Sequence, residues 1–196
     1  TAGYHVVILT NQRWENDLMI RGLGIDDRVI KTIPESLREG ITIYASSGTI
    51  KVTFNEQGRE VYGDVNDAQD GFNERTRMDD SAVALLVDNI QRIIEWYWRE
   101  YEANRGKYRD EYPSFIFRRP EVALHRVRGE VYGVSVLYLP SRVSGVGTLE
   151  EGQKDKRQEV LEAIRRMVEE ENPSFFEEYT TREAGITTID IRRRGT

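Results

Sequence analysis

Two histidines are the side chains of this sequence best suited to acid–base chemistry, because the pKa of imidazole lies near neutral pH. They are His5 and His125, and Arg119 lies six positions before the second of them. If the two imidazoles met in the fold, they could cleave a phosphodiester whose charge the arginine holds. His5 also lies in an apolar stretch, which is more typical of a hydrogen-bonded histidine in a sheet than of a catalyst. These three residues are the candidate catalytic residues.

A basic cluster extends over residues 118–128. Its arginines, the candidate anion-binding residues, are Arg118, Arg119, Arg126 and Arg128. Guanidinium groups bind phosphates in a bidentate way, and the nearby rings of Tyr112, Phe115 and Phe117 could stack on bases. The cluster therefore indicates a surface for nucleic acid or another anion. The alternative is an ordinary solvated surface, because the chain has 34 acidic residues that can pair with arginines.

The segment 64–79 is rich in carboxylate and amide side chains, which are the hard oxygen ligands that Ca²⁺ prefers. The candidate metal ligands in it are Asp64, Asp67, Asp70 and Glu74. The segment does not fit an EF-hand: with Gly71 at the glycine position of that loop, Arg77 falls where the bidentate glutamate belongs. A solvated loop of Asp, Asn and Gly is the alternative.

Aromatic side chains lie on more than one face of the helix predicted around residues 93–101. Its predicted buried stripe consists of Ile90, Ile94, Tyr97 and Tyr101. This stripe leaves Trp98 to meet a second packing layer or a partner protein. Phe175 and Phe176 follow a helix break at Pro173, and they predict either a lid on the core or a knob that docks into a partner.

Apolar periodicity predicts the elements that position these residues. A buried strand is predicted at 4–10 and a hairpin at 41–65. Further strands are predicted at 114–118, 121–128, 130–139 and 185–194. Two long helices are predicted at 79–104 and 154–171, and an aromatic turn at 174–179.

Hairpins outnumber crossovers in this order of elements. The sequence therefore predicts an α+β fold, in which a mainly antiparallel sheet of about six to seven strands packs against two longer helices. The first half follows the β-α-β-β-α-β order of a ferredoxin-like unit. Because no repeat or composition break marks a boundary, we expect a single α+β domain over residues 1–196.

Composition excludes several classes of function. The 196 residues include no cysteine, which excludes disulfides, thiolate metal sites and cysteine nucleophiles. The net charge of −6 disfavours attraction of the whole protein to nucleic acid but leaves a local basic face open. No apolar run reaches the length of a membrane helix and no targeting segment is recognised, so we expect no membrane partner and a soluble, cytoplasmic protein.

No compact catalytic motif is found, and aromatic side chains outnumber the visible core positions. We therefore hypothesise a non-enzymatic binding or assembly module, which uses aromatic helix faces for self-association or for a protein partner. The alternative is a nucleic-acid-binding or nucleic-acid-cleaving protein that uses the Arg/His face around residues 118–128. A small-molecule enzyme is a third hypothesis, and the sequence leaves any cofactor and any catalytic activity open.

Overall fold

A computed structural model describes most of the chain, and the structural statements below concern that part. The described residues are 5–10, 25–48, 50–61, 72–113, 116–127, 129–140, 156–184 and 187–194. By its internal contacts the chain divides into two compact units. The first unit comprises residues 1–79, 124–133 and 192–196, and the second comprises 80–123 and 134–191. The organisation as a single domain stays a prediction.

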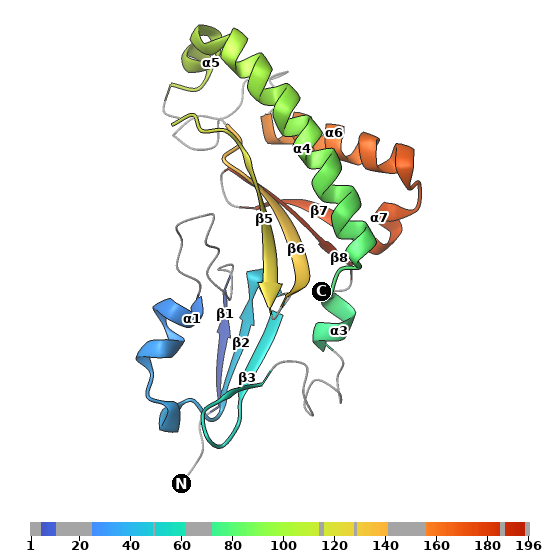
Figure 1. The fold of residues 1–196 in the computed structure, drawn as a ribbon. Helices are drawn as coiled ribbons and strands as arrows, with labels where there is room; N and C mark the ends of the chain where they lie inside the picture. The colour runs from blue at the N-terminus through green and yellow to red at the C-terminus, as the bar shows by residue number, and fades with distance from the viewer. Residues whose placement is uncertain are drawn as a thin grey trace. The chain divides into compact units, whose positions relative to one another are not determined.

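A four-stranded sheet forms the centre of the first unit (Figure 1). Its strands, in spatial order, are β1 (Val6–Leu9), β2 (Ile41–Ala45), β3 (Ile50–Phe54) and β4 (Glu60–Val61). β1 and β2 are parallel, and the other pairs are antiparallel. The short helices of this unit are α1 (Ile25–Arg28), η1 (Ile30–Thr32), η2 (Glu35–Leu37), η3 (Ser46–Gly48) and α3 (Phe72–Thr76).

The predicted hairpin is confirmed, because alternation places apolar side chains of β2 and β3 on buried positions. Ile43 and Val52 are paired across the two strands, and both are fully buried. β1 differs from the prediction of a buried strand, since Val7 is 53% and Leu9 75% exposed. β1 lies at the edge of its sheet, where only one neighbour covers it.

One side chain completes the outer side of β3. The Lys51 N–H donates to Asn73 Oδ1 (2.8 Å), and Asn73 Nδ2 donates to the Lys51 carbonyl (2.9 Å). The N–H and C=O of one strand residue point to the same side, and the described part of β4 pairs with Thr53 and Phe54. The amide of Asn73, which is buried on α3, therefore occupies the hydrogen-bonding positions that β4 does not reach.

The second unit contains the long helices, and β5, β6 and β8 have residues in both units. Its helices are α4 (Asp80–Ala103), α5 (Arg105–Glu111), α6 (Lys156–Glu171) and α7 (Phe175–Glu178). The second sheet consists, in spatial order, of β5 (Glu121–Val127), β6 (Glu130–Leu137), β8 (Thr188–Arg193) and β7 (Tyr179–Ala184). β6 and β8 are antiparallel, with Val134 opposite Ile191.

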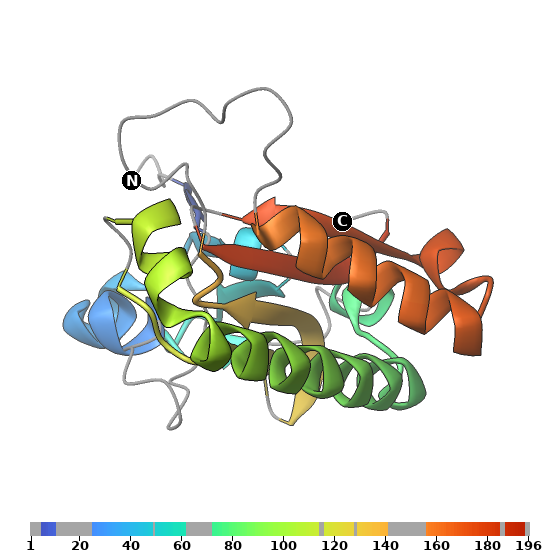
Figure 2. The same cartoon turned by 90° about the horizontal axis from the view of Figure 1, so that it is seen from above.

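α4 and α6 lie side by side in the second unit (Figure 2). The two helices are antiparallel: Arg92 in the middle of α4 pairs with Glu171 at the end of α6 (3.7 Å), whereas Lys156 at the start of α6 lies over Tyr108, beyond the C-terminal end of α4. The predicted bounds of both helices are confirmed to within two residues. None of the helices in the described ranges is long and apolar enough to cross a membrane.

The α+β class is confirmed, but three details of the predicted architecture are wrong. The strands within the described ranges form two sheets of four instead of one larger sheet. The first half is not ferredoxin-like, because β1 pairs directly with β2 and no strand splits this parallel pair. No strand forms at 116–118, where Ile116 is 77% exposed and Phe117 packs against tyrosines; residues 114 and 115 lie outside the described part.

The aromatic turn predicted at 174–179 is a short helix, α7, that leads into the unpredicted strand β7. Tyr179, the first residue of β7, stacks on Phe175 with ring centroids 4.5 Å apart. Arg165 on α6 donates to the hydroxyl of Thr181 through Nε (3.0 Å) and a terminal nitrogen (2.7 Å). These contacts with α6 and α7 stabilise a strand whose sequence, YTTREA, has little apolar character.

Candidate functional site

The aromatic side chains of α4 divide between two faces of the helix. Tyr97 is 1% exposed, whereas the neighbouring Trp96 is 59% exposed. Successive residues of a helix are rotated by about 100°, so two adjacent rings cannot share one narrow buried stripe. Trp96 is therefore the large aromatic side chain that α4 presents at the surface.

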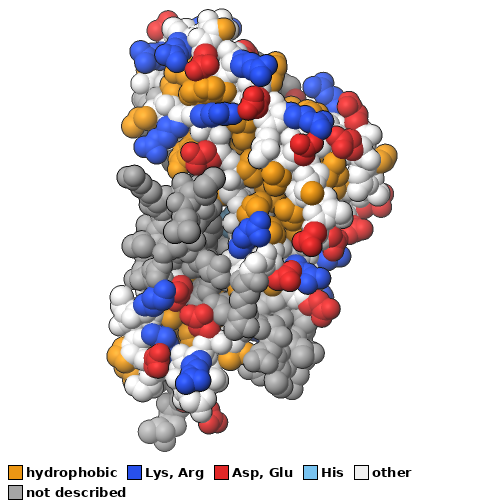
Figure 3. All heavy atoms as spheres, in the orientation of Figure 1, with side chains coloured by type: hydrophobic (Ala, Val, Ile, Leu, Met, Phe, Trp, Pro, Cys, Tyr) orange, Lys and Arg blue, Asp and Glu red, His pale blue; other side chains and the backbone are white. Residues whose placement is uncertain are grey.

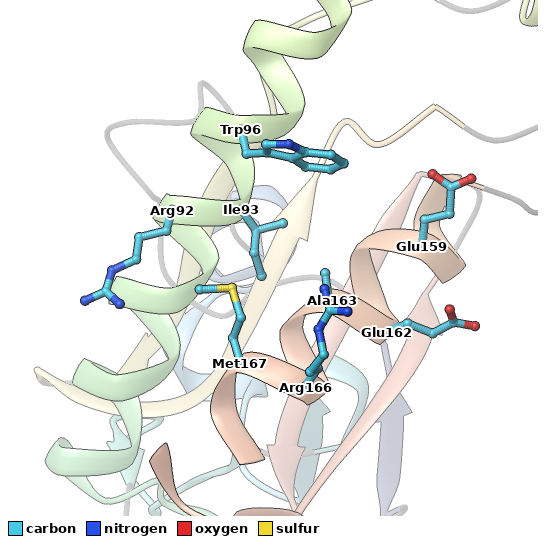
Figure 4. A pocket seen from close by; sticks show the side chains of 8 residues that line it. All are labelled: Arg92, Ile93, Trp96, Glu159, Glu162, Ala163, Arg166 and Met167. Carbon is cyan, nitrogen blue, oxygen red and sulfur yellow. The ribbon is translucent and has the colours of Figure 1, made fainter. Parts of the chain in front are cut away.

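Trp96 borders an open groove between α4 and α6. The groove has a volume of about 680 Å³ and is lined by Arg92, Ile93, Trp96, Glu159, Glu162, Ala163, Arg166 and Met167. The indole of Trp96 extends from α4 toward α6, and Ile93 and Met167 lie below it (Figure 4). The small side chain of Ala163 leaves the middle of the groove open. Hydrophobic side chains gather between charged ones over the surface of α4 and α6 (Figure 3).

Charged side chains surround this apolar floor. On α4, Arg92 pairs with Asp88 and with Glu171, and on α6 Glu159 pairs with Lys156. A second, shallower hollow of about 400 Å³ adjoins the groove on α6. It is lined by Glu162, Arg165, Arg166, Glu169 and Glu170. Because Glu162 and Arg166 line both hollows, the apolar groove continues into a charged surface.

Beyond the groove, the end of α4 carries a buried tyrosine cluster. It consists of Tyr97, Tyr101, Tyr108 and Tyr112, with Trp98 and Phe117 packed against it. Tyr101 stacks on Phe117, with ring centroids 4.7 Å apart and an interplanar angle of 15°. Trp98 is half-buried, and its ring lies 4.8 Å from that of Tyr101. Trp98 therefore has a packing layer within the chain.

Burial controls the protonation of this cluster. Desolvation is the main cause that raises the pKa of Tyr108, to about 12, although the charge of Lys156 acts in the opposite direction. Desolvation also raises the pKa of Tyr97 far above its usual range, and the neighbouring Tyr108 and Tyr112 add to this effect. Both phenols therefore stay neutral at any physiological pH.

A lysine of α6 contacts the tyrosine cluster. Lys156 Nζ lies 5.4 Å from the centre of the Tyr108 ring, and its side chain is 13% exposed. Desolvation alone would lower the pKa of Lys156, but the hydrogen bond to Glu159 and the neighbouring Tyr108 hold it above its usual range. Lys156 is thus a cation that links α6 to α5, not a neutral amine ready to act as a base.

The predicted catalytic residues lie in three different settings. His125 is buried on β5, and His5 is exposed before β1, with Nε2 at 3.2 Å from the Thr42 hydroxyl. Arg119 belongs to the second unit and pairs with Glu95 of α4 (2.8 Å).

The predicted basic face divides between the two units. Arg118 lies over the ring of Tyr138 at 5.4 Å in the second unit. Arg126 belongs to the first unit and donates to the Gly129 carbonyl of its own turn (3.0 Å). Arg128 lies outside the described residues. A shared anion-binding face of these arginines stays a prediction.

The structure describes both of the predicted aromatic docking residues near α7 and one of the four candidate metal ligands. Phe175 is 2% exposed and acts as a core residue, while Phe176 is half-buried with Arg165 at 5.9 Å from its ring. Glu74 is exposed on α3, and the other candidate ligands, Asp64, Asp67 and Asp70, lie outside the described residues. Among the described residues, no three acidic or histidine side chains come together as a metal site.

The sequence analysis did not predict that Trp96, which borders the groove, is the exposed ring of α4. Ile93 is itself buried, and Met167 lies opposite it on α6, so a wider apolar stripe of α4 ending at Ile93 would have indicated a second helix there. The prediction chose Trp98, although helical spacing puts Trp98 only about 70° from the centre of the predicted stripe and Trp96 about 130° from it. The segments that cover Trp98, around Tyr108 and Phe117, follow it in the chain and carry no pattern that assigns them to that side of α4.

No family model and no curated protein matches the sequence. Among solved structures, the chain is similar to the IMP-nucleotidase of Plasmodium falciparum at 11% identity and a TM-score of 0.44, over 96% of this chain and 39% of that protein. It is also similar to the trehalose-6-phosphate phosphatase of Aspergillus fumigatus at 12% identity and a TM-score of 0.38, over 96% of this chain and 46% of that protein. The chain spans less than half the length of both enzymes. Likenesses this low carry no argument about fold or activity.

Proposed function

We propose that this chain is a protein-binding module that binds another polypeptide in the groove between α4 and α6. The main support for the proposal is the exposure of Trp96, a residue that is 59% exposed beside the apolar floor of Ile93 and Met167. Tryptophan is enriched among residues that dominate binding energy, and such residues lie in hollows surrounded by polar side chains. Arg92, Glu159, Glu162 and Arg166 supply such a polar rim.

The shape of the groove favours a helical partner. Two antiparallel helices leave a furrow between them that runs along both axes, and the ridge of side chains on a third helix fits such a furrow. An amphipathic helix binds in this way through residues spaced at i, i+3, i+4 and i+7. Ala163 is the position where such a ridge can approach α6 most closely.

Site-specific photo-crosslinking tests the proposal. A benzophenone amino acid replaces Ala163 in the groove, and in a control chain it replaces Ala103, which is exposed at the end of α4 away from the groove. After irradiation of cells that contain either chain, we expect a discrete adduct from position 163 that position 103 does not give.

A second experiment tests whether the crosslinked partner binds through Trp96. The crosslinked protein, once purified, should bind the unmodified chain, and Trp96→Ala should weaken binding at least about tenfold, as expected for a hot-spot ring. Adducts that are the same at both positions, or a partner that binds the Trp96→Ala chain equally well, would refute the groove as the binding surface.

A further inference from the structure

The end of α6 carries more negative charge than the helix itself favours. Its last turn contains Glu169, Glu170 and Glu171 and no basic residue. The free carbonyl groups at the C-terminal end of a helix carry a partial negative charge, so carboxylates there are repelled by the helix. Within the described part of the chain, Glu171 pairs with Arg92, whereas Glu169 and Glu170 are exposed and have no partner.

These unpaired carboxylates adjoin the apolar groove. They line the shallow hollow that shares Glu162 and Arg166 with the groove. From Glu159 to Glu170, α6 covers twelve residues, or about 16 Å along its axis. A segment of about three helical turns therefore contacts both the Trp96 region and the acidic end of α6.

Resting on the function proposed above, we infer that the polypeptide bound in the groove is a basic amphipathic helix. Its apolar face covers Trp96, Ile93 and Met167, and its lysine or arginine side chains lie against Glu169 and Glu170. Arg166 has no ion-pair or hydrogen-bond partner among the described residues and is exposed between the two regions. The bound helix therefore has a neutral or acidic residue opposite Arg166, and this position sets its register.

A second copy of this chain brings like charges together in the register that pairs Glu162 with Arg166. When α6 is paired with an antiparallel copy so that Glu162 faces Arg166, Glu159 falls opposite Glu169 of the second copy. Two carboxylates then meet on each side of the two-fold axis, and one of them already pairs with Lys156. A partner with the opposite charge avoids this repulsion and also offsets the charge at the end of α6.

Two designed peptides test the inference with the purified full chain. Each has about 20 residues and the same leucine face at i, i+3, i+4 and i+7, but one has lysines and the other glutamates on its polar face. Binding is measured by fluorescence anisotropy of the labelled peptide over a salt series. We expect the lysine peptide to bind roughly 3- to 10-fold tighter at low salt, because two exposed ion pairs form, and the difference to shrink as salt screens them.

Variants that remove negative or positive charge from α6 should change peptide binding in opposite directions. Glu169→Gln combined with Glu170→Gln should weaken the lysine peptide roughly 3- to 10-fold, and Arg166→Gln should tighten it about twofold. Glu102→Gln is the matched control, because Glu102 is exposed on α4 away from both hollows. Circular dichroism shows whether each variant is folded.

The outcomes separate this inference from the proposed function. Equal binding of both peptides, tighter binding of the glutamate peptide, or binding of neither would overturn the basic helix. A dimer in sedimentation analysis that Trp96→Ala converts to a monomer would also overturn it, because a second copy would then fill the groove. In each of these cases the crosslink from position 163 still decides whether the groove binds protein at all.

Discussion

The groove and the tyrosine cluster are built from neighbouring residues of one helix, yet they use aromatic side chains in opposite ways. Trp96 exposes more than half of its surface, and Tyr97 exposes almost none. Tyr97 and its neighbours are covered by Tyr108, Tyr112 and Phe117, so their rings contribute to stability. Trp96 has apolar neighbours below it and nothing described above it, so its ring stays exposed to solvent. The later segments of the chain, and not the residue type, decide which role an aromatic side chain takes.

The largest expected effect is the loss of a ring from the cluster. Tyr101 is 5% exposed and contacts the rings of Trp98, Tyr108 and Phe117. Tyr101→Ala removes all three ring contacts and leaves a cavity, so the free energy of unfolding should fall by about 3 to 5 kcal/mol. Urea denaturation followed by circular dichroism measures this loss. A loss below about 1 kcal/mol would show that the cluster does not stabilise the chain.

Alkaline pH should lower the free energy of unfolding through the same tyrosine cluster. The pKa of Tyr108 is raised from 10.0 to about 12 in the folded chain, so above pH 10 the folded state binds more protons than the unfolded state. The free energy of unfolding therefore keeps its full value below pH 10 and falls as the pH rises toward 12. The contribution of Tyr108 to this fall is on the order of 2 kcal/mol. Lys156, whose pKa is also raised, contributes in the same direction. In Tyr108→Phe, urea denaturation between pH 9 and 11 should show a shallower decline than in the unmodified chain.

A smaller effect of opposite sign is expected at Tyr97. Its hydroxyl is buried and has no hydrogen-bond partner within the described ranges. A buried hydroxyl that loses water without gaining a partner costs free energy, so Tyr97→Phe should raise the free energy of unfolding by about 1 kcal/mol. Thermal unfolding measures the shift. A decrease of similar size would mean that the hydroxyl has a bound water as its partner.

The smallest effect on stability is expected at Trp96. Because most of the ring is exposed, Trp96→Ala should change the free energy of unfolding by no more than about 0.5 kcal/mol. The same substitution should weaken partner binding at least about tenfold, as proposed above. If Trp96→Ala destabilised the chain as strongly as Tyr101→Ala, the contrast between groove and cluster would not hold.

Local patterns in the sequence were sufficient to predict the main helices and strands. Asp80 and Ser81 at its start, followed by apolar residues at three- and four-residue spacing, predicted α4, and strict alternation predicted the β2–β3 hairpin. These signals depend on residues close together in the chain, so they could be recognised without the fold.

The candidate site depends on contacts between distant residues, and these could not be predicted. Glu95 pairs with Arg119, which is 24 positions away, so an arginine assigned to an anion-binding face contacts α4 instead. The separation into two sheets follows from strand pairings such as β6 with β8, which no local pattern specifies. The groove beside Trp96 likewise depends on α6, about 60 residues further along the chain.

The amide of Asn73 also removes one pair of backbone groups from the outer side of β3. A strand with free N–H and C=O groups at its edge is a template onto which a strand of another molecule can add. Asn73 occupies both groups of Lys51 where β4 does not extend, and so it blocks that template with a single side chain. Asparagine offers a donor and an acceptor at once, which neither aspartate nor leucine of similar size can do. One amide therefore satisfies this part of the strand edge, without the length of chain that a further strand would need.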